Sequence, residues 1–252
     1  MHIDLNADLG ESFGNFVIGE DAALMPFITS ANVAAGFHGG DPSVIRRTIR
    51  LAVSHGVRIG AHPSYPDLQG FGRREIRMSD WEVEDAVLYQ IASVAGIARA
   101  EGTTLQHVKP HGALYGVASR DPRIADAVAR AIAAFDASLV LFAPPGSALA
   151  RAGASAHLLV VREGFADRRY GADGALASRS AAGAVIEDAD LAAEQAVSIV
   201  RHGTVVALDG TAVALRVDTI CVHGDHPGAA ARAARVRAAL EAAAVSVTAP
   251  RR

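Results

Sequence analysis

Cysteine and lysine are nearly absent from this chain, each occurring once in 252 residues. The cysteine, Cys221, cannot form an internal disulfide or a thiolate zinc site, which is typical of a protein in the reducing cytoplasm. No apolar run approaches the roughly 18 residues of a membrane span, and the first residues lack the basic and apolar regions of a signal peptide. We therefore expect a cytoplasmic chain without membrane segments.

Positive charge is also in short supply. The 27 acidic side chains outnumber the 24 basic ones, for a formal net charge of −3. The sequence thus offers no basic excess for a nucleic acid or an anionic membrane, and we expect neither partner. All basic residues except Lys109 are arginines, which marks Lys109 as a position that favours a compact ammonium over a planar guanidinium.

Apolar residues, by contrast, are abundant enough for one large core. They make up 50% of the chain, and the length suits a single α/β barrel of about 250 residues. Strand-like runs alternate with helical segments, as in a parallel sheet, and no linker interrupts residues 1–252, so we expect one domain. The strand-like runs are His2–Leu9, Ile28–Ala35, Val57–His62, Leu105–Pro110, Leu139–Ala143, Leu158–Arg162, Thr204–Leu208 and Asp218–His223.

Local signals place the helices between these runs. Asp41 and Pro42 predict a helix start, and Gly56 predicts its end. The apolar face of this helix is Ile45, Ile49, Ala52 and Val53. Further helices are predicted from a Ser79/Glu82 capping box to Glu101, from Asp121 to about Ala134, from about Leu191 to His202, and from about Pro227 to Ala243.

Polar residues gather where the predicted strands end. In a βα barrel these loops converge on one face, where such barrels carry their active sites. We therefore expect segments far apart in the sequence to share one site. The residues concerned are Asp8, Glu11, Asn32, His38, Asp41, His62, Asp67, Lys109, His111, Glu163, Asp167, Arg168, His223 and Asp225.

Two short stretches are the most informative about chemistry. Lys109 and His111 project the same way if the chain is extended, and an ammonium there would bind a carboxylate or stabilise an oxyanion. The stretch from Glu163 to Tyr170 has two interpretations. It is either a surface network of ion pairs or a site where Arg168 holds a substrate carboxylate through a bidentate contact.

Other polar residues carry structural alternatives. His62 ends an apolar strand, where it either serves the site or bonds to a backbone carbonyl. Asp41 is best explained as a helix cap, and Cys221 as a small buried apolar residue rather than a nucleophile. Asp4 shares a face with Asp8 in the alternation of the first strand, but it could equally be solvated near the strand start.

The sequence contains residues that could bind a metal, but it contains no common motif for metal or nucleotide binding. Aspartate and several histidines at strand ends suit a divalent metal, yet no compact motif such as HExxH is present. There is also no GxxxxGK[ST] loop, so the chain shows no phosphate-binding site of that kind.

The assembled stretches resemble one family, the lactam-utilisation proteins, which form the A subunit of the ATP-hydrolysing 5-oxoprolinase. The resemblance covers residues 3 to 228, in the family's order. It departs at Ala7 and Ala35, where the family has cysteine, and at Gly116, where it has asparagine. The matching stretches are DLNADLGE from Asp4, SANVAAGFHGGDP from Ser30, GAHPSYPD from Gly60, GFGRR from Gly70, KPHGALY from Lys109, FADR from Phe165 and CVHGD from Cys221.

This resemblance implies both a fold and a reaction. The fold is a TIM-like (β/α)7 barrel of the glycoside hydrolase/deacetylase type. The reaction converts 5-oxo-L-proline, ATP and water to L-glutamate, ADP and phosphate, together with partner subunits B and C. A five-membered lactam is a stabilised amide, so phosphorylation of its carbonyl oxygen would assist opening, and the partners would handle the nucleotide.

From these observations we assign expected roles. Asp8 or His62 would act as general base, and Lys109 and His111 would stabilise oxyanion or phosphoryl oxygens. The substrate-binding set would be Glu11, Asn32, His38, Arg168 and His223, with His38 and His223 also available to a metal. Two alternatives remain: an ATP-independent, metal-dependent amidohydrolase or deacetylase, and a non-catalytic subunit that presents the substrate.

Overall fold

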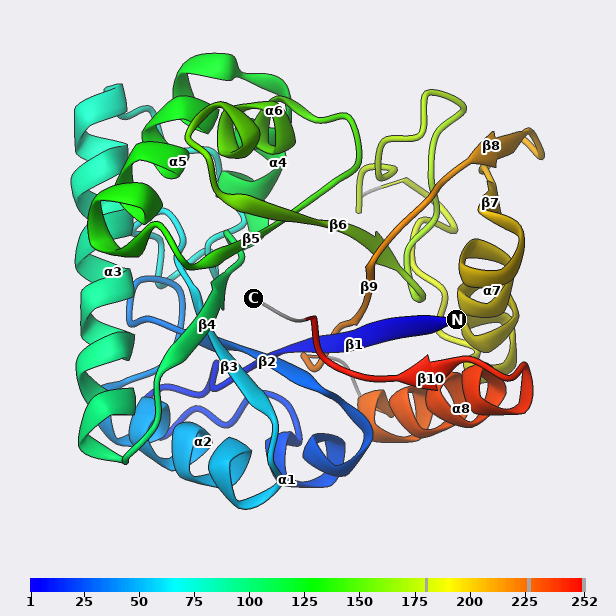
Figure 1. Ribbon diagram of the computed structural model, residues 1–252, viewed down its shortest axis with the longest axis horizontal. Coiled ribbons are helices and arrows are strands. Elements are labelled where there is room, and N and C mark those ends of the chain that lie inside the picture. The colour runs from blue at the N-terminus through cyan, green and yellow to red at the C-terminus, as the bar shows by residue number, and fades with distance from the viewer. Residues whose placement is uncertain (180, 226–227, 251–252) are drawn as a thin grey trace.

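Seven parallel strands form a closed barrel in the computed structural model, which describes residues 1–179, 181–225 and 228–250 (Figure 1). The barrel closes because β1 pairs with β2 on one side and with β9 on the other. The predicted parallel barrel is therefore confirmed. Its strands are β1 (His2–Leu9), β2 (Ser30–Ala34), β3 (Arg58–His62), β4 (Leu105–Val108), β5 (Val140–Ala143), β6 (Leu159–Phe165) and β9 (Thr219–Val222).

Helices cover the outside of the barrel (Figure 1). Alternate residues of each strand face them, so Ile3, Leu5, Ala7 and Leu9 of β1 belong to the large apolar core. The helical elements are α1 (Asp21–Leu24), the 3-10 turn η1 (Met25–Phe27), α2 (Pro42–Ser54), α3 (Asp80–Ala100), α4 (Gly112–Arg120), α5 (Pro122–Asp136), α6 (Ala148–Ser155), α7 (Ala189–His202) and α8 (Ala229–Ala242).

The predicted helix caps are confirmed. The side chain of Asp41 accepts hydrogen bonds from the backbone N–H groups of Ser43 and Val44. Ser79 and Glu82 form a reciprocal capping box, and Asp121 caps α5. One detail of α2 is wrong in the prediction: Val53 is 45% exposed, since the helix turns about 100° per residue and carries it past the buried stripe.

Other predicted elements differ from the structure. The run Thr204–Leu208 is not a barrel strand: β7 (Thr204–Val206) forms an antiparallel hairpin with β8 (Ala212–Ala214). Sequence signals also missed α4, α6 and the short strand β10 (Ser246–Val247), which pairs with the start of β1. Pro227, the predicted start of the last helix, lies outside the described residues.

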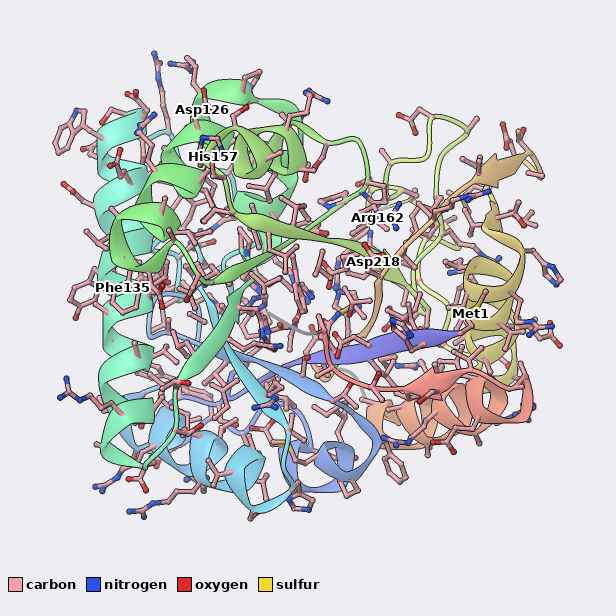
Figure 2. The ribbon with its side chains drawn as sticks, viewed as in Figure 1. Met1, Asp126, Phe135, His157, Arg162 and Asp218 are labelled. Carbon is pink, nitrogen blue, oxygen red and sulfur yellow. The ribbon has the colours of Figure 1, made fainter. Side chains whose placement is uncertain are left out.

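The seam between β6 and β9 is reinforced on its outer side. Arg162 of β6 makes a bidentate ion pair with Asp218, with N–O distances of 2.7 and 2.8 Å (Figure 2). The backbone N–H of Asp218 also donates to the carbonyl of Arg162. Separately, none of the helices in the described ranges is long and apolar enough to cross a membrane.

The interior of the barrel is polar over much of its length. Asn32 donates to the side-chain oxygen of Asn6 at 2.8 Å, and His107 bonds to Asn32 at 2.8 Å and stacks on Phe142. Near the N-terminal ends of the strands, Asp4 is 1% exposed. The interpretation of Asp4 as a solvated residue is therefore wrong, because it points inward with Asn6 and Asp8.

Candidate functional site

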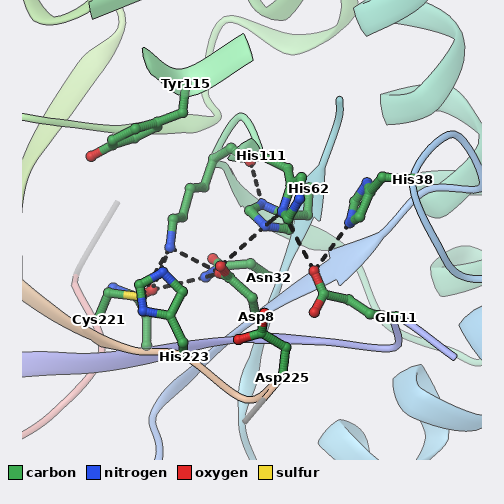
Figure 3. Close-up of polar contacts among 12 residues, drawn as sticks. Asp8, Glu11, Asn32, His38, His62, His111, Tyr115, Cys221, His223 and Asp225 are labelled. Atoms are coloured by element: carbon green, nitrogen blue, oxygen red, sulfur yellow. Dashed lines mark hydrogen bonds and ion pairs between the residues drawn. The ribbon is translucent and has the colours of Figure 1, made fainter. Parts of the chain in front are cut away.

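The predicted polar residues meet at the C-terminal ends of the barrel strands (Figure 3). They surround a cavity of about 380 Å³. Parallel strands bring their carboxyl ends to one face, so residues from both ends of the sequence become neighbours. Among the residues lining the cavity are Asp8, His62, Lys109, His111, Phe165, Arg168 and His223.

Lys109 lies buried between two carboxylates. Its Nζ is 2.9 Å from Asp8 Oδ1 and 3.0 Å from Glu163 Oε1, and it also contacts Cys221 Sγ at 3.1 Å. Burial opposes the charge, but Asp8, Cys221 and Glu163 raise the pKa of Lys109 well above its usual range. The ammonium therefore stays charged, and Asp8 and Glu163 fix its position.

The two carboxylates are themselves held by neutral donors. Asn32 donates to Asp8 Oδ1 at 2.8 Å, while the Tyr115 hydroxyl donates to Glu163 Oε2 at 2.7 Å. Burial opposes ionisation of Asp8, yet the charges of His62 and Lys109 hold its pKa well below its usual range. Asp8 is consequently an ionised carboxylate with one oxygen, Oδ2, left toward His62 at 3.3 Å.

Three histidines and a glutamate form a second cluster beside Asp8. His62 Nε2 and His111 Nδ1 are 3.0 Å apart, and Glu11 Oε1 is 3.4 Å from His111 Nδ1. His38 Nε2 is 3.2 Å from the same Glu11 oxygen, and its ring stacks on that of His111 with 3.8 Å between centroids. One ligand atom from each of the four lies within 4.8 Å of the others, so the group could hold a metal ion.

Burial dominates the protonation of this cluster. It lowers the pKa of His38 and of His111 well below the usual value, with neighbouring imidazoles adding to the effect. It raises the pKa of Glu11 well above its usual value, helped by the charges of Asp8 and Asp225. Both histidines are therefore neutral rings at physiological pH.

His223 is oriented from the opposite wall by Asp167. The Asp167 carboxylate accepts from the backbone N–H of His223 at 2.9 Å and lies 2.8 Å from its Nδ1. Although burial opposes its charge, His223 lowers the pKa of Asp167 to about 2. The ring of His223 packs on Phe165, with 5.5 Å between centroids. Asp167 thus engages Nδ1 of the ring, and Nε2 has no hydrogen-bond partner among the described residues.

Arg168 lies at the cavity wall with part of its guanidinium unused. It is 6% exposed, and one terminal nitrogen donates to the carbonyl of Ala177 at 2.6 Å. Its buried Nε has no hydrogen-bond partner among the described residues. Burial and then the charge of Arg179 lower its pKa to about 10. Gln195 fixes the segment by donating to the carbonyl of Arg168 at 2.8 Å.

The structure brings together all nine residues that the sequence assigned to the site, and each is buried. Glu11, Asn32 and His38 do not line the cavity but contact residues that do. The surface interpretation of Glu163 is wrong, because it is 2% exposed and pairs with Lys109. Burial of Cys221 is confirmed.

Some polar residues at strand ends have other roles, and one site residue was missed. Asp67 pairs with Arg74, and Asp225 pairs with Arg73 near the cavity mouth. Tyr115, which holds Glu163, was not assigned a role from sequence. The signal that identifies it is its position four residues after His111, one helical turn along α4 and facing the same cavity.

Fold and site together define a parallel α/β barrel with a buried, charged centre at the C-terminal ends of its strands. Residues 3–252 match the LamB/YcsF family. The chain belongs to this family, as its resemblance to lactam-utilisation proteins predicted.

Individual relatives are similar over almost the whole chain. A protein of Symbiobacterium thermophilum that is named as the A subunit of 5-oxoprolinase is 59% identical over 98% of this chain and 95% of its own. One of the same name from Chloroflexus aggregans is 57% identical over 100% of both. The crystal structure of the lactam utilization protein of Thermus thermophilus is 50% identical, with a TM-score of 0.94 over 99% of this chain and 100% of its own. The T48 deacetylase, at 13% identity and a TM-score of 0.50, covering 98% and 87%, shares the fold.

Proposed function

We propose that this chain is the A subunit of an ATP-dependent 5-oxoprolinase, which opens 5-oxo-L-proline to L-glutamate together with subunits B and C. Relatives of that name match it along nearly its full length. The observation that carries the proposal is the buried Lys109, held between Asp8 and Glu163 in the wall of a cavity that also presents Arg168. This arrangement suits a small substrate with a carboxylate and a reacting carbonyl.

The substrate carboxylate binds Arg168 in this proposal. A guanidinium offers paired donors to a carboxylate, and its buried Nε has no partner among the described residues. His223 Nε2 contributes a second polar contact from the same wall. The apolar face of the five-membered ring rests near Phe165, which also lines the cavity.

The ring opens by addition of water to the carbon of the phosphorylated carbonyl. Asp8 Oδ2 takes the proton of that water, since Oδ1 already accepts from Asn32 and Lys109. The C–N bond then breaks as the ring nitrogen gains a proton, and a second water releases phosphate from the resulting acyl phosphate. Lys109 and His111 offset the negative charge of the phosphoryl oxygens.

Partner subunits supply the nucleotide chemistry. The chain has no GxxxxGK[ST] loop, and the cavity of about 380 Å³ is at the small end of the usual range for ligand sites. We therefore assign ATP binding to B and C, with this barrel receiving the activated lactam. The single buried cysteine agrees with a cytoplasmic location.

The test measures release of glutamate and phosphate that depends on 5-oxoproline. Three mixtures are compared: this chain alone, the chain with its cognate B and C subunits, and B and C without it. We expect glutamate only in the complete mixture. Lactam opening by this chain alone without ATP would instead establish the amidohydrolase alternative, which the histidine cluster favours. If B and C alone release glutamate, the catalytic role is overturned.

A pair of arginine variants tests the substrate contact. Arg168→Gln should raise KM at least tenfold, because a buried charge-assisted pair is worth roughly 1.5–3 kcal/mol. Arg169→Gln is the matched control, since Arg169 does not line the cavity. Equal KM values for the two variants would remove Arg168 from substrate binding.

A further inference from the structure

Asp8 and Lys109 share a closed ring of hydrogen bonds with two asparagines. The Lys109 ammonium donates to Asp8 Oδ1 at 2.9 Å and, over a longer 3.4 Å, to the side-chain oxygen of Asn6. Asn32 Nδ2 donates to Asp8 Oδ1 (Figure 3) and to the same Asn6 oxygen, at 2.8 Å in both cases. Both amide protons of Asn32 are therefore used, and Asp8 Oδ1 is held from two sides.

This ring fixes the direction in which the Asn32 amide points. Asp8 is an ionised carboxylate that accepts from Lys109, so Asn32 must present its NH2 group to it. The amide oxygen of Asn32 consequently faces the other way, 2.8 Å from His107 Nε2. Since an amide oxygen only accepts, His107 Nε2 carries a proton and donates it to this hydrogen bond.

The barrel strands bring His107 to the Asn32 oxygen across a glycine. Asn32 of β2, Gly60 of β3 and His107 of β4 are paired in register on three neighbouring strands. A Cβ atom added to Gly60 would lie 2.1 Å from His107 Nε2, so the imidazole occupies the space that any other residue at this position would fill. The ring also stacks on Phe142, with 4.3 Å between centroids and 7° between planes. His107 is thus held in one place between these strands.

His107 does not line the cavity, so its effect on a substrate would be indirect. We propose that His107 is a positioning residue, which acts through Asn32 to hold Asp8 Oδ1 and so directs Asp8 Oδ2 toward the reacting water. The proposal rests on the proposed function for the role of Asp8 as proton acceptor. If the His107 donor is removed, the buried oxygen of Asn32 loses this hydrogen bond, and an unpaired buried acceptor is costly. Rotation of the amide toward another donor would then withdraw its NH2 group from Asp8.

Two replacements of His107 separate the hydrogen bond from the packing. His107→Leu removes the donor, whereas His107→Gln keeps an N–H group at a similar distance from the backbone. In the assay with B and C, we expect kcat to fall about tenfold in His107→Leu, as for the loss of a hydrogen bond to a charged group. KM should change less than roughly twofold, because Arg168 and Phe165 lie outside the hydrogen-bonded ring.

The conservative variant and a neighbour supply the controls. His107→Gln should recover most of the lost kcat. Gln106→Leu is the matched control, since this buried residue of β4 donates to the carbonyl of Pro250 instead, and it should keep the wild-type kcat. Urea denaturation checks that each variant folds. Equal losses of kcat in His107→Leu and His107→Gln would overturn the proposal.

A double-variant cycle tests whether His107 acts through Asn32. In an Asn32→Ala background, His107→Leu should lower kcat by less than roughly twofold more, because the link to Asp8 is already cut. Multiplying losses of kcat, as for two independent residues, would overturn the action through Asn32.

Nuclear magnetic resonance of the intact chain tests the same link without the reaction. The nitrogen chemical shifts of the His107 ring should show a protonated Nε2, and the side-chain amide protons of Asn32 should exchange slowly with water. Exchange should become clearly faster in His107→Leu and stay near the wild-type rate in His107→Gln. An Nε2 without a proton, or unchanged exchange in His107→Leu, would overturn the positioning role. Absence of glutamate in the complete wild-type mixture would overturn the proposed function instead, and the resonance measurement would still decide whether His107 holds Asn32.

Discussion

Two aspartates of β1, four residues apart, meet opposite surroundings at the two ends of the barrel interior. Within the described residues, Asp4 accepts only from neutral hydroxyls, those of Thr29 and Ser30 at 2.7 Å and of Thr219 at 2.5 Å. Burial outweighs these donors and raises its pKa to about 6. Asp8 is also buried, but His62 at 3.3 Å and the Lys109 ammonium at 2.9 Å lower its pKa well below the usual value.

The difference shows what is needed to keep a carboxylate ionised inside a barrel. Hydroxyl dipoles recover part of the lost hydration, whereas a full opposite charge recovers more than all of it. At the N-terminal end of the barrel interior, Asp4 is therefore held by hydrogen bonds from neutral groups. At the C-terminal end, Asp8 and Lys109 stay charged. This matches the division of such barrels into a stability face and an active face.

Removing the Lys109 ammonium should have the largest effect, because it takes away the charge that distinguishes the surroundings of Asp8 from those of Asp4. Lys109→Met leaves Asp8 and Glu163 buried without a countercharge, so we expect the free energy of unfolding to fall by about 3–5 kcal/mol. Glutamate formation with B and C should be lost. Urea denaturation and the coupled assay measure the two effects.

A double variant separates stability from chemistry at the same position. Adding Glu163→Gln to Lys109→Met removes one unpaired carboxylate, so part of the stability should return while activity does not. Near-normal activity in the Lys109→Met single variant would exclude Lys109 from the mechanism.

Neutralising Asp8 should have the next largest effect. Asp8→Asn keeps the hydrogen bond from Lys109, which still pairs with Glu163 at 3.0 Å, but it removes the proposed proton acceptor. We expect kcat to fall by about 10²–10⁴-fold, with a much smaller loss of stability than in Lys109→Met. A kcat within tenfold of wild type would transfer the role of base to His62.

Neutralising Asp4 should have the smallest effect of these substitutions. Its effect on the free energy of unfolding should be opposite in sign to that of Lys109→Met and Asp8→Asn. The pKa of Asp4 rises from 3.8 to about 6 on folding, so the folded chain binds more protons between these values. The contribution of Asp4 to the free energy of unfolding is therefore fully present below pH 4. It is lost as the pH rises through 6, and the loss is roughly 3 kcal/mol at most. In Asp4→Asn, the free energy of unfolding from urea melts should differ less between pH 5 and pH 8 than in the wild type. Activity should be unchanged. A fall of the same size in the variant would assign the pH dependence to other groups.

The sequence predicted features whose signals are local. Caps such as Asp41 and the Ser79/Glu82 box are contained within four residues, so they identify helix starts without any tertiary information. By contrast, β7 has the same β-branched composition as a barrel strand, and nothing nearby reveals that it pairs with β8. The helix α6 was missed because it has only eight residues, ALARAGAS, and its buried face consists of small residues apart from Leu149.

The sequence predicted which residues lie in the site, but not which of them contact one another. Polar residues at strand ends converge in any parallel barrel, which is why Lys109 and Asp8 were identified. The partners of Lys109 depend on the registers of β1, β4 and β6, so Glu163 could not be separated from a surface residue. The same holds for Asp4, whose alternation with Asp8 gives its face but not its surroundings.

The pairing of β1 with β9 has a consequence for synthesis of the chain. Asn6 lies opposite Cys221 in this ladder, although the ribosome makes them more than two hundred residues apart. Until β9 has emerged, β1 presents an open edge, and the polar groups of Asp8 lack one wall of their enclosure. A nascent chain thus carries an unfinished charged centre for most of its translation, and these long-range contacts favour slow closure of the barrel and a need for protection from aggregation.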